Sequence, residues 1–160
     1  ERRPILKLRT RRPDQEIEEY LVSAEGIVFM PQNFKPTVLE NLPFLLPATS
    51  LVETAQGIEP IEGVAQVCKL LDLARRNYPS IYRDWKVVSF DRLGPGFEGD
   101  PGAYALINSG KVKSLRFGPD NFPDQMKRLK YLLHERSVEG VSQVASIDLS
   151  LGRSVFVKTK

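Results

Sequence analysis

The 160-residue sequence contains one cysteine, Cys68, and one histidine, His134. One cysteine excludes an internal disulfide framework, and one cysteine with one histidine cannot supply the four ligands of an ordinary structural zinc site. No segment approaches the run of roughly 18 apolar residues that a membrane-spanning helix requires. We therefore expect a domain that is held together by its own hydrophobic core.

Residues that could perform catalysis or bind a metal are equally few. His134 falls near the end of a predicted helix, where a surface position is favoured over a general base. Cys68 falls on the apolar stripe of another predicted helix, where burial raises the pKa of a thiol and makes it a poor nucleophile. The acidic residues at 16–19 lack the alternating oxygen ligands and the glycine turn of a calcium loop. We predict no enzymatic activity, no cofactor, no metal and no small-molecule substrate.

The charge of the chain is unevenly distributed. Residues 1–12 hold six basic residues and one acidic residue, a net charge of +5, so the remaining residues carry −2 of the total of +3. A basic segment can bind nucleic acid or an acidic membrane surface. However, Ile5, Leu6 and Leu8 lie among these basic residues. That pattern also fits a strand with exposed charges, which is the interpretation we favour.

The first third of the chain favours short strands. Residues 5–9, 19–23 and 26–30 are rich in β-branched, leucine and aromatic side chains, and the last two segments have the spacing of a hairpin. Residues 30–50 contain four prolines, which remove backbone donors and fix φ. We predict an ordered surface loop for this proline-rich stretch.

Two segments have helical spacing, at 61–79 and 122–137. The apolar stripe of the first consists of Val64, Val67, Cys68, Leu71 and Ala74. The stripe of the second consists of Phe122, Met126, Leu129 and Leu133. Further strands are predicted at 85–90, 104–108 and 111–117. We predict an α+β fold, with a twisted, mainly antiparallel sheet and two helices packed on one side of it.

The last 17 residues, "VASIDLSLGRSVFVKTK", predict a final hairpin. Alternation places Ile147, Leu149 and Leu151 on one face of its first strand. In the second strand Val155 and Val157 share one face, whereas Ser154, Phe156 and Lys158 share the other. Such a strand lies either inside the sheet or at its edge, where it can pair with another chain. The alternation alone leaves both positions open.

Several short motifs follow one another in a recognisable order. They are "ERRP" at 1–4, "YLVSAEGIVFMP" from Tyr20, "NLPFLLP" from Asn41, "SGKVKSLRFG" from Ser109, the helix from Pro123 and "SIDLSL" from Ser146. This order resembles the extracytoplasmic β domain of the bacterial cell-division family FtsQ/DivIB over nearly the whole chain. The chain departs from the family at Ser23, Ser150 and Leu151, where Asp, Arg and an aromatic residue are common.

The resemblance implies a domain organisation and a location. Residues 1–9 would be the end of a truncated POTRA-like domain, and residues 10–160 would form the FtsQ-type β domain. Because Glu1 is not a natural start, we expect an anchoring segment upstream. The full-length protein would then be anchored in the cytoplasmic (inner) membrane, with this domain on the extracytoplasmic or periplasmic side.

The resemblance also implies a function and partners. The domain would be a non-enzymatic scaffold of the division septum, or divisome, that recruits FtsB-like and FtsL-like coiled-coil proteins. Its last strand would pair with a strand of the partner, which is recognition by strand addition. The implied partner-binding residues are Leu151, Arg153, Ser154, Val155, Phe156, Val157 and Lys158.

A nucleic-acid-binding domain is the alternative. It would use the basic segment at 1–12 together with Lys127, Arg128 and Lys130 of the second predicted helix. No zinc-finger or RNP pattern accompanies these charges, and Tyr131 alone does not make a stacking platform. We regard nucleic-acid binding as the less favoured function.

Overall fold

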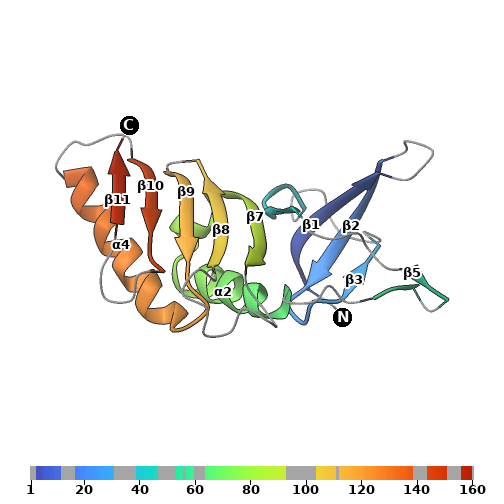
Figure 1. Ribbon diagram of the computed structural model, residues 1–160. Helices are drawn as coiled ribbons and strands as arrows, with labels where there is room; N and C mark the ends of the chain where they lie inside the picture. Colours follow the sequence, from blue (N-terminus) through green and yellow to red (C-terminus); the bar gives the residue numbers. More distant parts are fainter. Residues whose placement is uncertain are drawn as a thin grey trace.

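The computed structural model describes residues 3–11, 17–30, 39–46, 53–55, 57–59, 64–92, 104–110, 112–138, 144–150 and 156–159. Nine of its strands form one sheet in the order β11-β10-β9-β8-β7-β4-β1-β2-β3 (Figure 1). From β1 the bounds are Pro4–Arg11, Ile17–Ser23, Val28–Phe29, Phe44–Leu46, Glu53–Thr54, Gly57–Ile58, Trp85–Arg92, Tyr104–Ser109, Val112–Phe117, Val144–Asp148 and Phe156–Thr159. Strands β5 and β6 pair separately with each other.

The α+β class is confirmed, but the expectation of a mainly antiparallel sheet is wrong because the sheet is mixed. Parallel pairing joins β1 to β4, β4 to β7, and β9 to β10. Parallel neighbours need a crossover connection, which is commonly a helix. The two main helices occupy such connections, since α2 (Val64–Asn77) lies between β4 and β7 in the chain and α4 (Phe122–Val138) lies between β9 and β10.

Both predicted helices are present, and they contribute to one core. The buried side chains of α2 are Val64, Val67, Cys68, Leu70, Leu71 and Ala74. Those of α4 include Phe122, Met126 and Leu129, which belong to the same buried cluster. A short helix, α3 (Pro79–Tyr82), follows α2 directly. In Figure 1, α4 lies beside the β10–β11 end of the sheet and α2 lies near β7 and β8.

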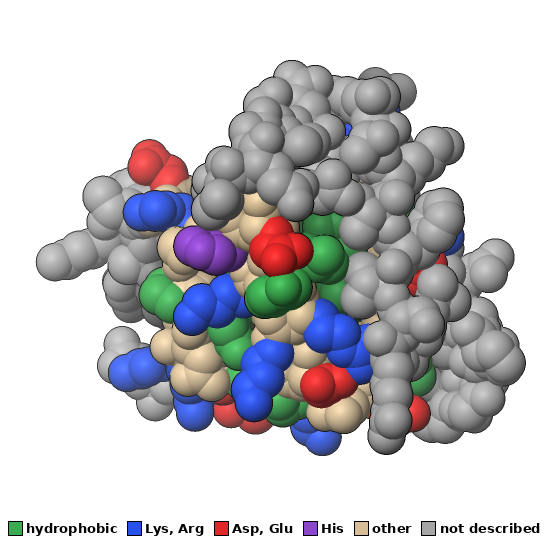
Figure 2. Space-filling model, turned by 90° about the vertical axis from the view of Figure 1, so that its left-hand side faces the viewer, with side chains coloured by type: hydrophobic (Ala, Val, Ile, Leu, Met, Phe, Trp, Pro, Cys, Tyr) green, Lys and Arg blue, Asp and Glu red, His purple; other side chains and the backbone are tan. Residues whose placement is uncertain are grey.

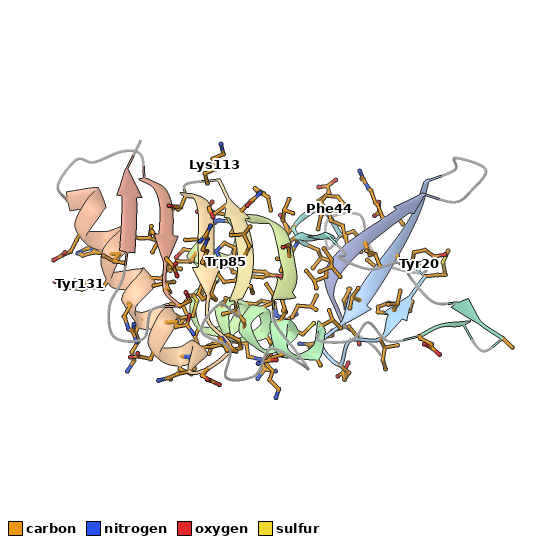
Figure 3. All side chains as sticks on the ribbon, in the orientation of Figure 1. Tyr20, Phe44, Trp85, Lys113 and Tyr131 are labelled. Carbon is orange, nitrogen blue, oxygen red and sulfur yellow. The ribbon has the colours of Figure 1, made fainter. Side chains whose placement is uncertain are left out.

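Aromatic rings fill the centre of this core. Trp85, which is 2% exposed, makes edge-to-face contacts with Tyr82 and Phe117, with ring centroids 5.9 and 5.8 Å apart. Edge-to-face geometry is favourable because the positive ring edge meets the negative ring face. Figure 3 shows Trp85 in the middle of the strand block formed by β7, β8 and β9.

The hairpin of β2 and β3 is confirmed, and its turn is fitted to the start of α2. Gly26 has φ +86°, a conformation that side chains disfavour, and its amide donates to the Ser23 carbonyl at 2.9 Å. A Cβ at this position would lie 2.7 Å from Cγ1 of Val64. Glycine therefore allows both the turn and the close approach of the helix.

Strand β1 is more deeply buried than the sequence suggested. The predicted strand at 5–9 is present, but it lies between β4 and β2, and Ile5, Leu6 and Leu8 are each 0% exposed. These three residues belong to the same buried cluster as the helices, so β1 is part of the core. The predicted boundary between residues 1–9 and 10–160 stays a prediction.

Strand β4 was missed from the sequence. Residues 44–46 lie in the stretch that we expected to be a loop, yet Leu45 is buried and aligns with Leu8 on one side and Val88 on the other.

The parts at 31–38 and 47–50 of that stretch, and the predicted partner-binding residues at 151–155, lie outside the described residues. Among the described residues, no helix is long and apolar enough to span a membrane.

The position of β1 can be tested with a pair of neighbouring substitutions. Leu8→Ala should lower the free energy of unfolding by about 2–5 kcal/mol, because it leaves a cavity in the core. Arg9→Ala, one residue further and on the opposite face, should change it by less than about 1 kcal/mol, because exposed ion pairs contribute little. Urea unfolding followed by tryptophan fluorescence would measure both changes. Equal effects of the two substitutions would contradict the central position of β1.

Candidate protein-interaction site at the sheet edge

The predicted terminal hairpin is present at one edge of the sheet. Strand β11 pairs antiparallel with β10, and it is the outermost strand on that side in the described part of the chain. Strand β10 pairs parallel with β9, which attaches the hairpin to the rest of the sheet. Among the described strands, β11 is therefore an edge strand, as predicted, and not an interior one.

The register of the hairpin agrees with the predicted alternation. Val157 aligns with Ile147, which is 1% exposed, and Phe156 aligns with Asp148, which is half-buried. For Phe156, Val157 and Lys158 the structure describes the backbone positions alone. Leu151, Arg153, Ser154 and Val155 lie outside the described residues. The roles of all seven as partner-binding residues therefore stay predictions.

The chain leaves β10 through a hydrogen-bonded turn. The Leu149 amide donates to the Arg116 carbonyl at 2.8 Å, which continues the pairing with β9. The Asp148 carboxylate then accepts from the Ser150 amide at 2.9 Å and from the Ser150 hydroxyl. This local side-chain bonding is typical of aspartate at the start of a turn. It holds the backbone of residues 148–150 in place where β10 ends.

Gly118, at the end of β9, packs closely against this turn. A Cβ on Gly118 would lie 3.3 Å from the Ser150 Cα and 3.5 Å from its Cβ. A separation of 3.3 Å is tighter than ordinary van der Waals contact, so a larger residue would displace the turn. The end of β9 therefore packs directly against Ser150, just after β10.

Gln125 holds Gly118 in place from the first turn of α4. Its side chain is 3% exposed and accepts from the Gly118 amide at 2.9 Å. It also donates to the carbonyls of Gly118 at 3.2 Å and Asp120 at 2.6 Å. These bonds satisfy backbone groups that would otherwise be buried without partners. Asn121 completes the connection with φ 59°, a left-handed conformation that asparagine tolerates.

The outer surface of α4 carries charges of both signs. Lys127, Lys130 and His134 are exposed, and the Tyr131 ring is 62% exposed with its hydroxyl donating to Glu135 at 2.6 Å. Figure 2, which looks at this end of the molecule, shows basic side chains interspersed with acidic and hydrophobic ones. The expected surface position of His134 is confirmed. The surface is not a field of a single charge sign.

The two basic features of the nucleic-acid alternative are far apart. Strand β1 and helix α4 lie toward opposite ends of the sheet (Figure 1). Arg128 of α4 is moreover paired with Asp124, four residues earlier on the same helix. The two features therefore do not form one basic surface on the described part of the chain. Binding to nucleic acid at either one stays untested.

The described residues do not form a recognisable metal-binding group. They contain no cluster of three or more His, Cys, Asp or Glu side chains that could hold a metal ion. Cys68 is buried in α2, where its thiol donates to the Ser23 carbonyl at 3.5 Å. Burial raises the pKa of the Cys68 thiol to about 12, and the nearby carboxylates of Glu25 and Asp72 add to the shift. Its predicted position on the apolar stripe is confirmed.

A scan against models of protein families found no match to this chain, and a search of curated proteins found no similar sequence.

Sequence reasoning identified the hairpin but missed the residues that position it. Gly118 follows a predicted strand, and Gln125 lies in a polar turn of a predicted helix. Neither has a local pattern that reveals a contact with Ser150 or with backbone groups at 118–120. The contact of Gly118 with Ser150 depends on the parallel pairing of β9 with β10, which local periodicity does not encode.

The contact at Gly118 predicts a selective effect of one methyl group. Gly118→Ala should lower the free energy of unfolding by about 1–3 kcal/mol, because a methyl group is forced into a packed contact. It should also speed amide hydrogen exchange in β11. Gly110→Ala is the matched control, since a Cβ there would meet only the Asp84 carbonyl at 3.8 Å. If both variants exchange alike in β11, Gly118 does not position the hairpin.

The buried thiol predicts slow chemistry at Cys68. At about pH 8 the thiolate fraction of a group with this pKa is on the order of 10⁻⁴. We expect an aromatic disulfide that releases a coloured thiolate to react with Cys68 of the native protein only as the protein unfolds. The same reagent should react with the urea-unfolded chain at once. Absorbance at the released-thiolate band would give both rates. Rapid modification of the native protein, unaffected by stabilising salt, would contradict the burial.

Proposed function

We propose that this chain is a non-enzymatic scaffold domain of the bacterial cell-division apparatus, similar to the β domain of FtsQ/DivIB. It binds partner division proteins by strand addition at β11. The proposal rests on the order of the sequence motifs together with the position of β11 at the edge of the sheet. The single observation that carries the binding mode is that edge position.

Strand addition at β11 has a direct physical basis. An edge strand presents backbone N–H and C=O groups on its outer side, and a second chain can satisfy them as it does in a sheet. Hydrogen bonds along the main chain then supply affinity, while alternate side chains supply specificity. The β9–β10 pairing and the Asp148–Ser150 turn hold the receiving strand in a defined place. A strand that is already ordered loses less entropy when it binds.

The opposite edge of the sheet is less suited to this role. It is formed by β3, which has two residues, whereas β11 has four. Because main-chain hydrogen bonds accumulate with the length of the paired strand, β11 can hold a partner strand more firmly.

The partners and the location follow from the family resemblance. FtsB-like and FtsL-like coiled-coil proteins are the proposed partners, and the proposed location is the extracytoplasmic side of the cytoplasmic membrane. A calorimetric titration of the chain with purified FtsB-like and FtsL-like proteins from the same organism would test the proposed partners. If no binding of these partners is detected at either low or high salt, the proposal is wrong. Binding of DNA or RNA that falls steeply as salt rises would favour the nucleic-acid alternative.

A paired substitution in the hairpin tests the docking edge. Phe156→Glu should change the free energy of unfolding by less than about 1 kcal/mol, as for most surface changes. It should nevertheless weaken binding of the FtsB-like partner by about tenfold or more, because an interface anchor is replaced by a charge. Thermal melts and calorimetric titration would measure the two effects separately.

Val155→Asp is the comparison for that experiment. The sequence alternation places Val155 on the core-facing side of the strand, so an unpaired carboxylate there should destabilise the fold by several kcal/mol, roughly. If Phe156→Glu unfolds the protein, the assignment of faces is wrong. If it binds the partner as well as the unsubstituted chain does, β11 is not the docking edge.

A further inference from the structure

Two basic side chains of β1 lie over an aromatic ring on β4. The ammonium of Lys7 lies 4.2 Å from the centroid of the Phe44 ring, and the guanidinium carbon of Arg9 lies 4.6 Å from it. Lys7 and Phe44 are register partners in the parallel pair of β1 and β4. Figure 3 shows Phe44 between β7 and β1, where β4 joins the two parts of the sheet.

This cluster lies on the sheet face away from the helices. Successive residues of a strand point to opposite faces. Leu8, Leu45 and Val88 are aligned across the three strands and belong to the core that α2 covers. Lys7, Phe44 and Val87 are aligned one residue earlier, and they therefore share the other face. Phe44 and Val87 are only half-buried.

The Lys7 ammonium is desolvated without a paired carboxylate. Lys7 is 8% exposed, and burial lowers its pKa. The positive charges of Arg9 and Lys86 act in the same direction, while Glu19 and Glu40 partly oppose them. Among the described residues, no carboxylate lies within ion-pair distance of Lys7 or Lys86, whereas Arg9 is paired with Glu19 at 3.2 Å. The ammonium of Lys7 instead lies over the ring face of Phe44.

A buried cation held by an aromatic ring lacks the counter-charge that usually stabilises it. We propose that Lys7, Arg9, Phe44 and Lys86, the Lys7–Phe44 cluster, dock an acidic segment of a partner protein, whose carboxylate faces the Lys7 ammonium. The carboxylate supplies the missing charge, and apolar neighbours of the acidic residue cover the half-buried Phe44 and Val87. This surface is separate from β11 and does not depend on the function proposed for it.

The charges around the cluster favour a carboxylate over a nucleic-acid backbone. Glu19 and Glu40 lie close enough to act on the charge of Lys7. These two carboxylates partly offset the positive charge of the cluster, so it presents too little net positive charge for a row of phosphates. Phosphate binding would also require several unpaired cations in a row. Here Arg9 is already neutralised by Glu19.

A pair of blocked peptides can test the site on the whole chain. The probe is an extended Glu-Leu-Glu-Leu-Glu peptide, and its control has Gln in place of each Glu. In an NMR titration we expect saturable shifts of amides in β1, β4 and β7 with the acidic peptide and none with the control. Sodium acetate is a third arm, and equal shifts with acetate would show that the site takes a small anion and overturn the proposal.

Two substitutions assign the binding to the cluster. Lys7→Met should weaken binding of the acidic peptide about tenfold, the scale of a lost hydrogen bond to a charged group. The matched control is Lys127→Met, because Lys127 is an exposed lysine on α4 and should leave binding unchanged. Arg9→Gln, at a side chain that is 59% exposed, should weaken binding about threefold and keeps the test possible if Lys7→Met unfolds. Unchanged binding in both variants, or an equal loss with Lys127→Met, would overturn the proposal.

Discussion

The fold depends on the continuous burial of one face of a long mixed sheet. The buried residues run from β1 through β4, β7, β8 and β9 to β10, and no single helix can cover that width. Helices α2 and α4 divide the task, and each is also the crossover that makes two neighbouring strands parallel. The two helices that cover the sheet therefore also determine which of its strands run parallel. This explains why the two glycines with the closest contacts, Gly26 and Gly118, lie where the chain turns next to these helices.

The same constraint accounts for the exposed features of the molecule. Besides the face that the helices cover, the sheet has two edges and a second face. One edge ends in β3, which is very short, as edge strands often are. The other ends in β11, which is anchored through β10 to β9. On the second face, charged residues and half-buried apolar residues alternate along β1 and β4 with the core positions. The Lys7–Phe44 cluster results from that alternation.

Much of the fold could be predicted from the sequence where the signal is local. The 3.6-residue periodicity located both long helices, and alternation with turn residues located the hairpins and the strands of the β7–β9 block. Strand β4 was missed because Pro43 and Pro47 flank three residues that are too few for a pattern. The parallel pairs were missed because the residues of a strand do not determine which other strand pairs with it. The order strand, helix, strand around α2 and α4 was the available signal, and it favours a crossover.

The site was predictable to a similar extent. The edge position of β11 was expected from the family resemblance, whereas the contacts of Ser150 with Gly118, and of Gly118 with Gln125, required the three-dimensional arrangement. The same holds for Lys7 and Phe44, which are 37 residues apart and meet only because β4 enters beside β1. The two proposed surfaces belong to strands at different places in the sheet, with several strands between them. Effects at such distant positions normally add. A substitution at one surface that abolished binding at both would therefore indicate a change in the shared core and not a lost contact.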